Sequence, residues 1–271
     1  MAGFEGDYYK HQKGGVTVAF IAGRCSDHAF IQLVTEERAE YVRFPLAAYQ
    51  RRVGEMRIGD NRFCPEGVEV CLQTTLGRID NHDLTPLHYD IMGPFAPLPM
   101  QCRHSITSLH HRLEGGLVIE GAAVDFSGGV GYIEGDAGRS FPRSYAWMQC
   151  NDFAQKACIT ASVADIPFVG LRFRGCICVV YVDGTEYRLA TYLGVKIRCC
   201  TSERLVLEQG RLRLEVDLRP ATSCRLAAPN KGEMTREIRE CLTCGGQFRF
   251  YRAGEPLLDV WSGNVSCEFV E

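Results

Sequence analysis

The most informative part of the sequence is residues 175–218, which read GCICVVYVDGTEYRLATYLGVKIRCCTSERLVLEQGRLRLEVDL. In Arg211–Leu218, leucine and valine occupy every second position, which is the period of a β-strand with one buried face. Asp183-Gly184 and Gln209-Gly210 separate the apolar segments, and glycine supplies the positive φ that a hairpin turn needs. This stretch predicts antiparallel strands joined by tight turns.

The same pattern extends over most of the chain. Further short segments rich in β-branched or aromatic residues are 15–21, 29–34, 39–44, 68–72, 117–120, 145–153 and 157–163. Met234–Leu242 fits either a short helix or a strand, and its period does not decide between them. Strands with one apolar face bury it by closing a sheet on itself or by packing two sheets together. We therefore predict an all-β fold of antiparallel barrels or sandwiches.

Residues 81–100 interrupt the strand pattern with four prolines, at positions 86, 94, 97 and 99. Proline removes a backbone donor from a β-ladder, so this stretch is predicted to be an irregular connector or a pocket-lining loop. Strand-rich sequence of similar character lies on both sides of it. We expect two structural units with a boundary near residues 100–112.

The composition excludes several classes of protein. The formal net charge is −3 and the pI about 6.2, which argues against a nucleic-acid partner. The longest apolar runs are far too short for an integral membrane segment, which leaves only peripheral membrane contact open. The first twelve residues have no apolar core of a secretory signal, so we expect a cytoplasmic protein.

Fourteen cysteines are many for 271 residues. Their uneven spacing favours free thiols used as small core residues in a reducing compartment. Cys241-x-x-Cys244 could be half of a zinc site or a redox pair, but no second such motif accompanies it. We expect these two cysteines to be ordinary core residues as well.

Residues 125–153, DFSGGVGYIEGDAGRSFPRSYAWMQCNDF, contain the strongest candidate for a functional site. A glycine-rich turn carries Glu134 and Asp136, and the strand that follows places Trp147, Gln149 and Asn151 on one face. Buried amides need hydrogen-bond partners, so this face suits a ligand cavity better than a plain core. The alternative is a half-exposed strand whose few polar groups are satisfied. A phosphate loop is rejected because no Gly-Lys-Ser/Thr sequence follows the glycines.

The segment 131–153 resembles the signature of the tocopherol cyclase-like family, in which Gly-Tyr, Glu-x-Asp-Trp-Gly, Ser-Phe-Pro and Trp-x-Gln-x-Asn follow one another. Tyr8-Tyr9-Lys10, Ile58–Phe63 and Gly93-Pro94-Phe95 resemble other parts of that family, so the likeness spans most of the chain. The resemblance implies two consecutive lipocalin-like (calycin) antiparallel β-barrels or sandwiches, here residues 1–105 and 106–271, with the signature in the second. It also implies kinship with carotenoid 1,2-hydratase-type enzymes.

By this resemblance the chain is an intramolecular cyclase or hydratase, in which a neutral carboxylic acid protonates an alkene of a prenylated quinol or similar apolar molecule. Such an acid needs a desolvated pocket, and the resulting cation needs aromatic faces. Asp136 is the first choice for the acid and Glu134 the second. The residues expected to bind substrate are Tyr132, Arg139, Phe141, Trp147, Gln149, Asn151 and His104. Arg139 would either anchor a polar head group or pair with Asp136.

The sequence departs from the family pattern at Ala137, where the family has tryptophan, and this predicts a wider or differently shaped pocket. Five histidines within thirty residues could supply metal ligands, but their spacing fits no zinc motif. We expect no metal and no cofactor, an apolar small molecule as the partner, and His104 facing a cleft between the two units. The alternative function is a lipocalin-like protein that binds a hydrophobic molecule without chemistry. The sequence does not indicate an oligomeric state.

Overall fold

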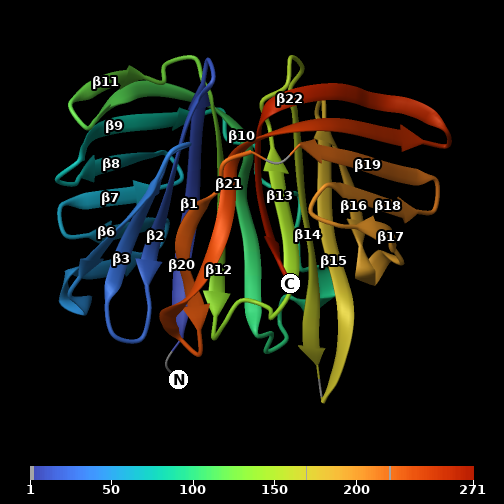
Figure 1. The fold of residues 1–271 in the computed structure, drawn as a ribbon, viewed down its shortest axis with the longest axis horizontal. Coiled ribbons are helices and arrows are strands. Elements are labelled where there is room, and N and C mark those ends of the chain that lie inside the picture. The colour runs from blue at the N-terminus through green and yellow to red at the C-terminus, as the bar shows by residue number, and fades with distance from the viewer. Residues whose placement is uncertain (1–2, 169, 220) are drawn as a thin grey trace.

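The computed structural model describes residues 3–168, 170–219 and 221–271. It consists of two large antiparallel β-sheets that lie side by side, with three short 3-10 helices as its helical elements in the described residues (Figure 1). The predicted all-β fold of two lipocalin-like units is confirmed. Met234–Leu242, which the sequence left undecided, belongs to strand β21 (Glu233–Arg252).

The first sheet has twelve strands in the order β4-β3-β2-β1-β12-β10-β9-β8-β7-β6-β5, and β11 pairs with β10. Its strands are β1 (Phe4–Lys13), β2 (Val16–Arg24), β3 (Ala29–Val34), β4 (Ala39–Phe44), β5 (Tyr49–Arg52), β6 (Glu55–Ile58), β7 (Asn61–Cys64), β8 (Gly67–Cys71), β9 (Thr75–His82), β10 (Cys102–Ile119), β11 (Ala122–Asp125) and β12 (Val130–Gly138). The 3-10 helices η1 (Leu46–Ala48) and η2 (Gly93–Phe95) interrupt this half of the chain.

The second sheet has ten strands in the order β16-β15-β14-β13-β22-β21-β19-β18-β17, and β20 pairs with β21. Its strands are β13 (Tyr145–Cys150), β14 (Ala157–Phe168), β15 (Leu171–Val182), β16 (Thr185–Ala190), β17 (Lys196–Cys200), β18 (Arg204–Gln209), β19 (Leu212–Arg219), β20 (Cys224–Asn230), β21 (Glu233–Arg252) and β22 (Glu255–Val270). The 3-10 helix η3 (Thr191–Leu193) follows β16.

The predicted boundary between the two units, after residue 105, does not match the boundary between the two sheets. That residue lies inside β10, which pairs with β9 and β12 of the first sheet, and the chain passes to the second sheet at residues 139–144. The proline-rich connector does not separate the two units, because it joins β9 to β10 within one sheet. The segment 131–153 consequently spans both sheets, with β12 in the first and β13 in the second.

Three apolar clusters hold the molecule together. One lies within the first sheet, around Phe20, Phe63 and Ile79, and a second lies within the second sheet, around Phe248 and Phe250. The third is formed by residues of both sheets, including Tyr8 and Tyr132 from the first and Trp147 and Leu226 from the second. Because burial of apolar area is the main favourable contribution to folding, this shared cluster fixes the two sheets against each other.

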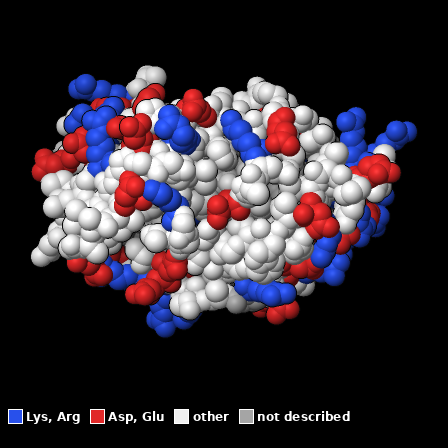
Figure 2. Space-filling view, turned by 90° about the horizontal axis from the view of Figure 1, so that it is seen from above, with Lys and Arg blue, Asp and Glu red and all other residues white. Residues whose placement is uncertain are grey.

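Acidic and basic side chains are interspersed over the face seen in Figure 2, without a broad area of one sign. This agrees with the small net charge of the sequence. Within the described residues, no helix combines the length and the apolar character needed to cross a membrane.

Candidate active site

A cavity of about 170 Å³ lies between the two sheets, where the shared apolar cluster opens. A dry cavity of similar size is enough to hold a small aromatic ring. Its wall is mainly apolar, and the residues that line it include Phe4, Tyr8, Met92, Phe95, Met100, His104, Glu134, Asp136, Phe141, Tyr145, Trp147, Ile238 and Glu268. Three of these, Met92, Phe95 and Met100, come from the proline-rich connector, so that stretch does line a pocket.

Strand β12 carries the two predicted acids to this cavity. Glu134 and Asp136 are two residues apart on a strand, so both side chains point to the same side. Gly135 between them points the other way, where a Cβ atom would come within 2.7 Å of the Asp7 carboxylate. His104 on β10 pairs in register with Asp136 and adds an imidazole to the acids.

Glu134 is the buried acid of the site, with 6% of its surface exposed. Its Oε2 accepts hydrogen bonds from the Tyr132 hydroxyl at 2.6 Å and from the Trp147 indole at 3.3 Å. Burial raises the pKa of Glu134 to about 7, although the charge of His104 opposes this shift. Since both donors bind Oε2, Oε1 is the oxygen that can carry a proton.

His104 links the two acids. Its Nδ1 lies 3.1 Å from Oδ1 of Asp136, and its Nε2 lies 3.5 Å from Oε2 of Glu134. Burial lowers the pKa of His104, but the charges of Glu134 and Asp136 outweigh burial and raise it to about 9. At neutral pH the site therefore holds a protonated imidazole beside two carboxyl groups.

We expect the imidazole of His104 to titrate near pH 9 in the wild-type protein. In the double variant Glu134→Gln, Asp136→Asn, burial is opposed only by the weaker effect of the Asp90 charge, so the pKa of His104 should fall below its ordinary value of about 6.5. Ring-proton NMR of the histidines measures both values. His110, whose pKa burial lowers to about 4, is the internal control and should titrate alike in both proteins. An unchanged midpoint for His104 would show that the acids do not act on it.

Aromatic rings form much of the remaining wall. The rings of Tyr8 and Trp147 pack edge to face, with their centroids 5.6 Å apart. The ring of Phe141 packs in the same way against Phe4, at a centroid distance of 5.5 Å, and against Tyr145, at 5.9 Å. Phe141 and Trp147 thus lie where substrate-binding residues were expected, whereas Tyr132 is buried behind Glu134 and does not line the cavity. The negative faces of such rings attract a positive charge that develops in the cavity.

Gln149 and Asn151 are outside the cavity, contrary to expectation. The Gln149 carbonyl accepts a hydrogen bond from the buried ammonium of Lys10 at 3.1 Å. The Asn151 amide donates to the backbone carbonyls of Gly131 at 2.8 Å and Leu109 at 3.2 Å, and its oxygen accepts from Gln12 at 2.8 Å. These amides bind the first sheet to the second, so their hydrogen bonds are structural.

The positions of Arg139 and Ala137 relative to the cavity also differ from those predicted from the sequence. The Arg139 side chain is exposed and does not line the cavity, and in the described part of the chain it makes no ion pair with Asp136. Ala137 is exposed on the face of β12 opposite to Asp136. The lack of tryptophan at position 137 therefore does not widen this cavity.

Two further acids, one buried (Glu240) and one half-buried (Glu268), were not predicted from the sequence. Glu268 on β22 lines the cavity and accepts a hydrogen bond from the Tyr145 hydroxyl at 2.5 Å. Glu240 on β21 accepts one from Tyr8 at 2.7 Å. Burial raises the pKa of Glu240 to about 7 and that of Glu268 well above its ordinary value. The sequence contained a sign that Glu240 lies on a strand, because it extends the alternating positions of Met234, Arg236 and Ile238.

Within the described residues, three groups of side chains bring potential metal donors together: Cys241 with Cys244 and Cys267, Cys25 with Asp27 and His28, and His104 with Glu134 and Asp136. In the last group, Oε2 of Glu134 already accepts two hydrogen bonds and His104 is held between two acids. These contacts place the three side chains close enough to exchange protons with one another. The remaining histidines of the 82–111 stretch lie outside these groups.

Fold and site together define a protein of two lipocalin-like β-units with a buried carboxyl group, that of Glu134, in an apolar cavity between the two sheets. Three solved structures share the fold. A protein of Nitrosomonas europaea described as an AttH has 12% sequence identity and a TM-score of 0.60, and the match covers 99% of this chain and 93% of that chain. Kievitone hydratase from Nectria haematococca has 10% identity and a TM-score of 0.55 (98% of this chain, 88% of that chain), and CghA with Sch210972 has 10% identity and a TM-score of 0.63 (99% and 88%). No family model matches the sequence, and no curated protein matches it.

Proposed function

We propose that this chain catalyses proton-initiated addition to an alkene of an apolar small molecule, with Glu134 as the general acid. The observation that carries the proposal is the Glu134 carboxyl, which is buried in an apolar cavity and has a pKa raised to about 7. A carboxylic acid that stays protonated near neutral pH can transfer its proton to a weak base such as a double bond. This proposal reverses the order expected from the sequence, because Asp136 is more exposed than Glu134 and is paired with His104.

Ring closure needs no reagent besides the substrate, and hydration needs only water. The Glu134 proton forms a C–H bond at the less substituted alkene carbon, and the π-electron pair leaves a tertiary cation at the other carbon. Trp147 and Phe141 line the cavity, and their aromatic rings stabilise a positive charge that forms there. A phenol oxygen of the same molecule, or water, then forms the C–O bond, and its proton returns to the Glu134 carboxylate. The first nucleophile gives ring closure and the second gives hydration.

The charge of His104 supports the transfer. Its protonated imidazole lies 3.5 Å from Oε2 of Glu134, so it stabilises the carboxylate that forms when the proton leaves. Asp136 at 3.1 Å keeps the imidazole charged and fixes its orientation. Asp136 and His104 therefore position and tune the acid.

The substrate class is inferred from the wall of the cavity and from likeness to other proteins. Aromatic and aliphatic side chains accept a prenyl group and a ring, and the acid and hydroxyl groups accept a phenol. One structure of the same fold is named a hydratase, and the signature in residues 131–153 resembles tocopherol cyclase-like proteins. We take a prenylated phenol or hydroquinone as the class of substrate.

We expect the rate of turnover to fall as the pH rises through about 7. The general acid must be protonated, and the protonated fraction of Glu134 decreases above its pKa. The logarithm of kcat plotted against pH measures this dependence. A rate that instead rises with pH across this range would contradict an acid role for Glu134.

The test is incubation of the protein with 2-prenylhydroquinone, followed by chromatography and mass spectrometry of the products. A chroman of unchanged mass, or a tertiary alcohol heavier by one water, supports the proposal. Saturable binding of the probe, measured by quenching of tryptophan fluorescence, with no conversion at any pH would overturn it in favour of a binding protein. Heat-denatured protein is the control for spontaneous cyclisation.

A further inference from the structure

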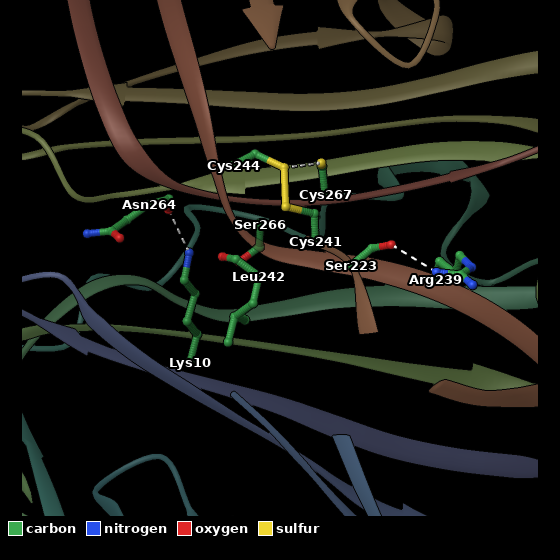
Figure 3. Close-up of a disulfide and its surroundings, with 9 residues drawn as sticks. All are labelled: Lys10, Ser223, Arg239, Cys241, Leu242, Cys244, Asn264, Ser266 and Cys267. Atoms are coloured by element: carbon green, nitrogen blue, oxygen red, sulfur yellow. Dashed lines mark hydrogen bonds between the residues drawn. A yellow bond between two sulfur atoms is a disulfide. The ribbon is translucent and has the colours of Figure 1, made fainter. Parts of the chain in front are cut away.

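Three cysteines form a cluster in the second sheet that the proposed reaction does not use. Cys241 and Cys244 lie on β21 and Cys267 lies on the neighbouring β22 (Figure 3). Their sulfur atoms all lie within 4.8 Å of one another. None of the three lines the cavity, since they belong to the apolar cluster inside the second sheet.

Cys241 and Cys244 are joined by a disulfide, which corrects the expectation that both are free thiols. Residues three apart in a regular strand are roughly 10 Å apart, too far for a disulfide. Here their Cα atoms are 6.0 Å apart because β21 bulges between them. Cys241 pairs with Cys267 and Cys244 with Val265, so three steps on β21 match two on β22.

The third cysteine is in contact with this bond. Sγ of Cys267 lies 3.3 Å from Sγ of Cys244 (Figure 3). Cys267 is partly exposed, whereas Cys241 and Cys244 are 6% and 1% exposed. A disulfide exchanges when a thiolate attacks one of its sulfurs, and Cys267 is already placed beside one.

We infer that the three cysteines form one thiol–disulfide exchange site, in which Cys244 alternates its bond between Cys241 and Cys267. In the exchange, the Cys267 thiolate attacks the Cys244 sulfur, the Cys244–Cys267 bond forms and the Cys241–Cys244 bond breaks. Cys241 leaves as a thiolate and takes up the proton that Cys267 lost. No oxidant or reductant is consumed.

The same arrangement gives a route by which a low-molecular-weight disulfide such as glutathione disulfide oxidises the reduced site. Cys267, as the most exposed sulfur, attacks it, forms a mixed disulfide and releases one glutathione. Cys244 then displaces the second glutathione from Cys267, and Cys241 displaces Cys267 from Cys244. Two thiols are oxidised and one disulfide is reduced, so the electrons balance.

Burial raises the pKa of the Cys267 thiol to about 12, with Glu240 and Glu268 adding to the shift and Lys10 opposing it. Only a small fraction is therefore thiolate at neutral pH, and the exchange should be slow there. For this reason the experiment uses long incubation in a mildly alkaline buffer.

The test distinguishes the two disulfide bonds by mass spectrometry of tryptic peptides, prepared from the full-length protein. Cleavage after Arg239, Arg249 and Arg252 places Cys241 and Cys244 in one peptide, residues 240–249, and Cys267 in another, residues 253–271. The Cys241–Cys244 bond is then internal to one peptide, whereas the Cys244–Cys267 bond links two. Acid quenching and alkylation before digestion prevent further exchange.

After equilibration of the wild-type protein in a glutathione redox buffer, we expect the internal bond to predominate and the linked pair of peptides to be present as a minor species. In Cys241→Ser, the linked pair should become the main oxidised form. Cys64→Ser, which removes a buried thiol of the first sheet, should behave like the wild type. Free Cys244 and Cys267 in oxidised Cys241→Ser, together with no linked pair in the wild type, would overturn the inference. The wild-type measurement remains decisive if the variant does not fold.

Discussion

Replacement of Glu134 by glutamine should lower kcat for 2-prenylhydroquinone by on the order of a hundredfold or more, with little change in KM. The amide keeps the size of the side chain, and its carbonyl can still accept the hydrogen bonds from Tyr132 and Trp147. It has no transferable proton, so only the chemical step is lost. Steady-state kinetics of both proteins, with product measured by chromatography, gives the comparison.

Two matched variants separate this role from that of other acids. Glu268→Gln changes the cavity acid on the opposite sheet and should retain most of the activity, although its Tyr145 contact is altered. Asp136→Asn should lower the rate by roughly tenfold, because it acts through the charge of His104. A dead Glu268→Gln or Asp136→Asn beside an active Glu134→Gln would reject Glu134 as the acid.

Asn151→Ala should destabilise the protein by about 2–4 kcal/mol. The side chain is 1% exposed, and its loss removes hydrogen bonds to Gly131, Leu109 and Gln12, which all belong to the other sheet. These buried groups would lose their partner without access to water. The midpoint and slope of urea unfolding measure the change.

Asn230→Ala is the control, because Asn230 is exposed at the end of β20, and its effect should stay within about 0.5 kcal/mol. A loss below about 1 kcal/mol for Asn151→Ala would show that this amide does not hold the sheets together.

The strands were predictable because their side chains alternate. Arg211–Leu218 has an apolar residue at every second position, and β19 covers Leu212–Arg219. The boundary was not predictable from composition, because prolines mark a loop without showing which strands the loop joins. The pairing of β10 with β9 and of β12 with β1 places residues 102–138 in the first sheet.

The acidic pair of the candidate site was predictable from its residue types, but its local structure was not. The glycines around Glu134 and Asp136 predicted a turn, whereas both residues lie on strand β12, whose period of two directs both side chains to the cavity. Gln149 and Asn151 follow Trp147 on one face, yet they hydrogen-bond to Lys10 and Gly131 of the first sheet and do not line the cavity. Glu268 comes from the far end of the chain, and local sequence does not reveal which distant strand completes a cavity.

The most direct test is the protonation of Glu134 itself. Infrared difference spectra between the wild type and Glu134→Gln, recorded as a function of pH, isolate the carbonyl band of the protonated carboxyl group from those of Glu240 and Glu268. We expect a band that is present in mildly acidic buffer and disappears with a midpoint near pH 7. A midpoint near the ordinary glutamate pKa of about 4.3 would contradict a neutral acid in the cavity.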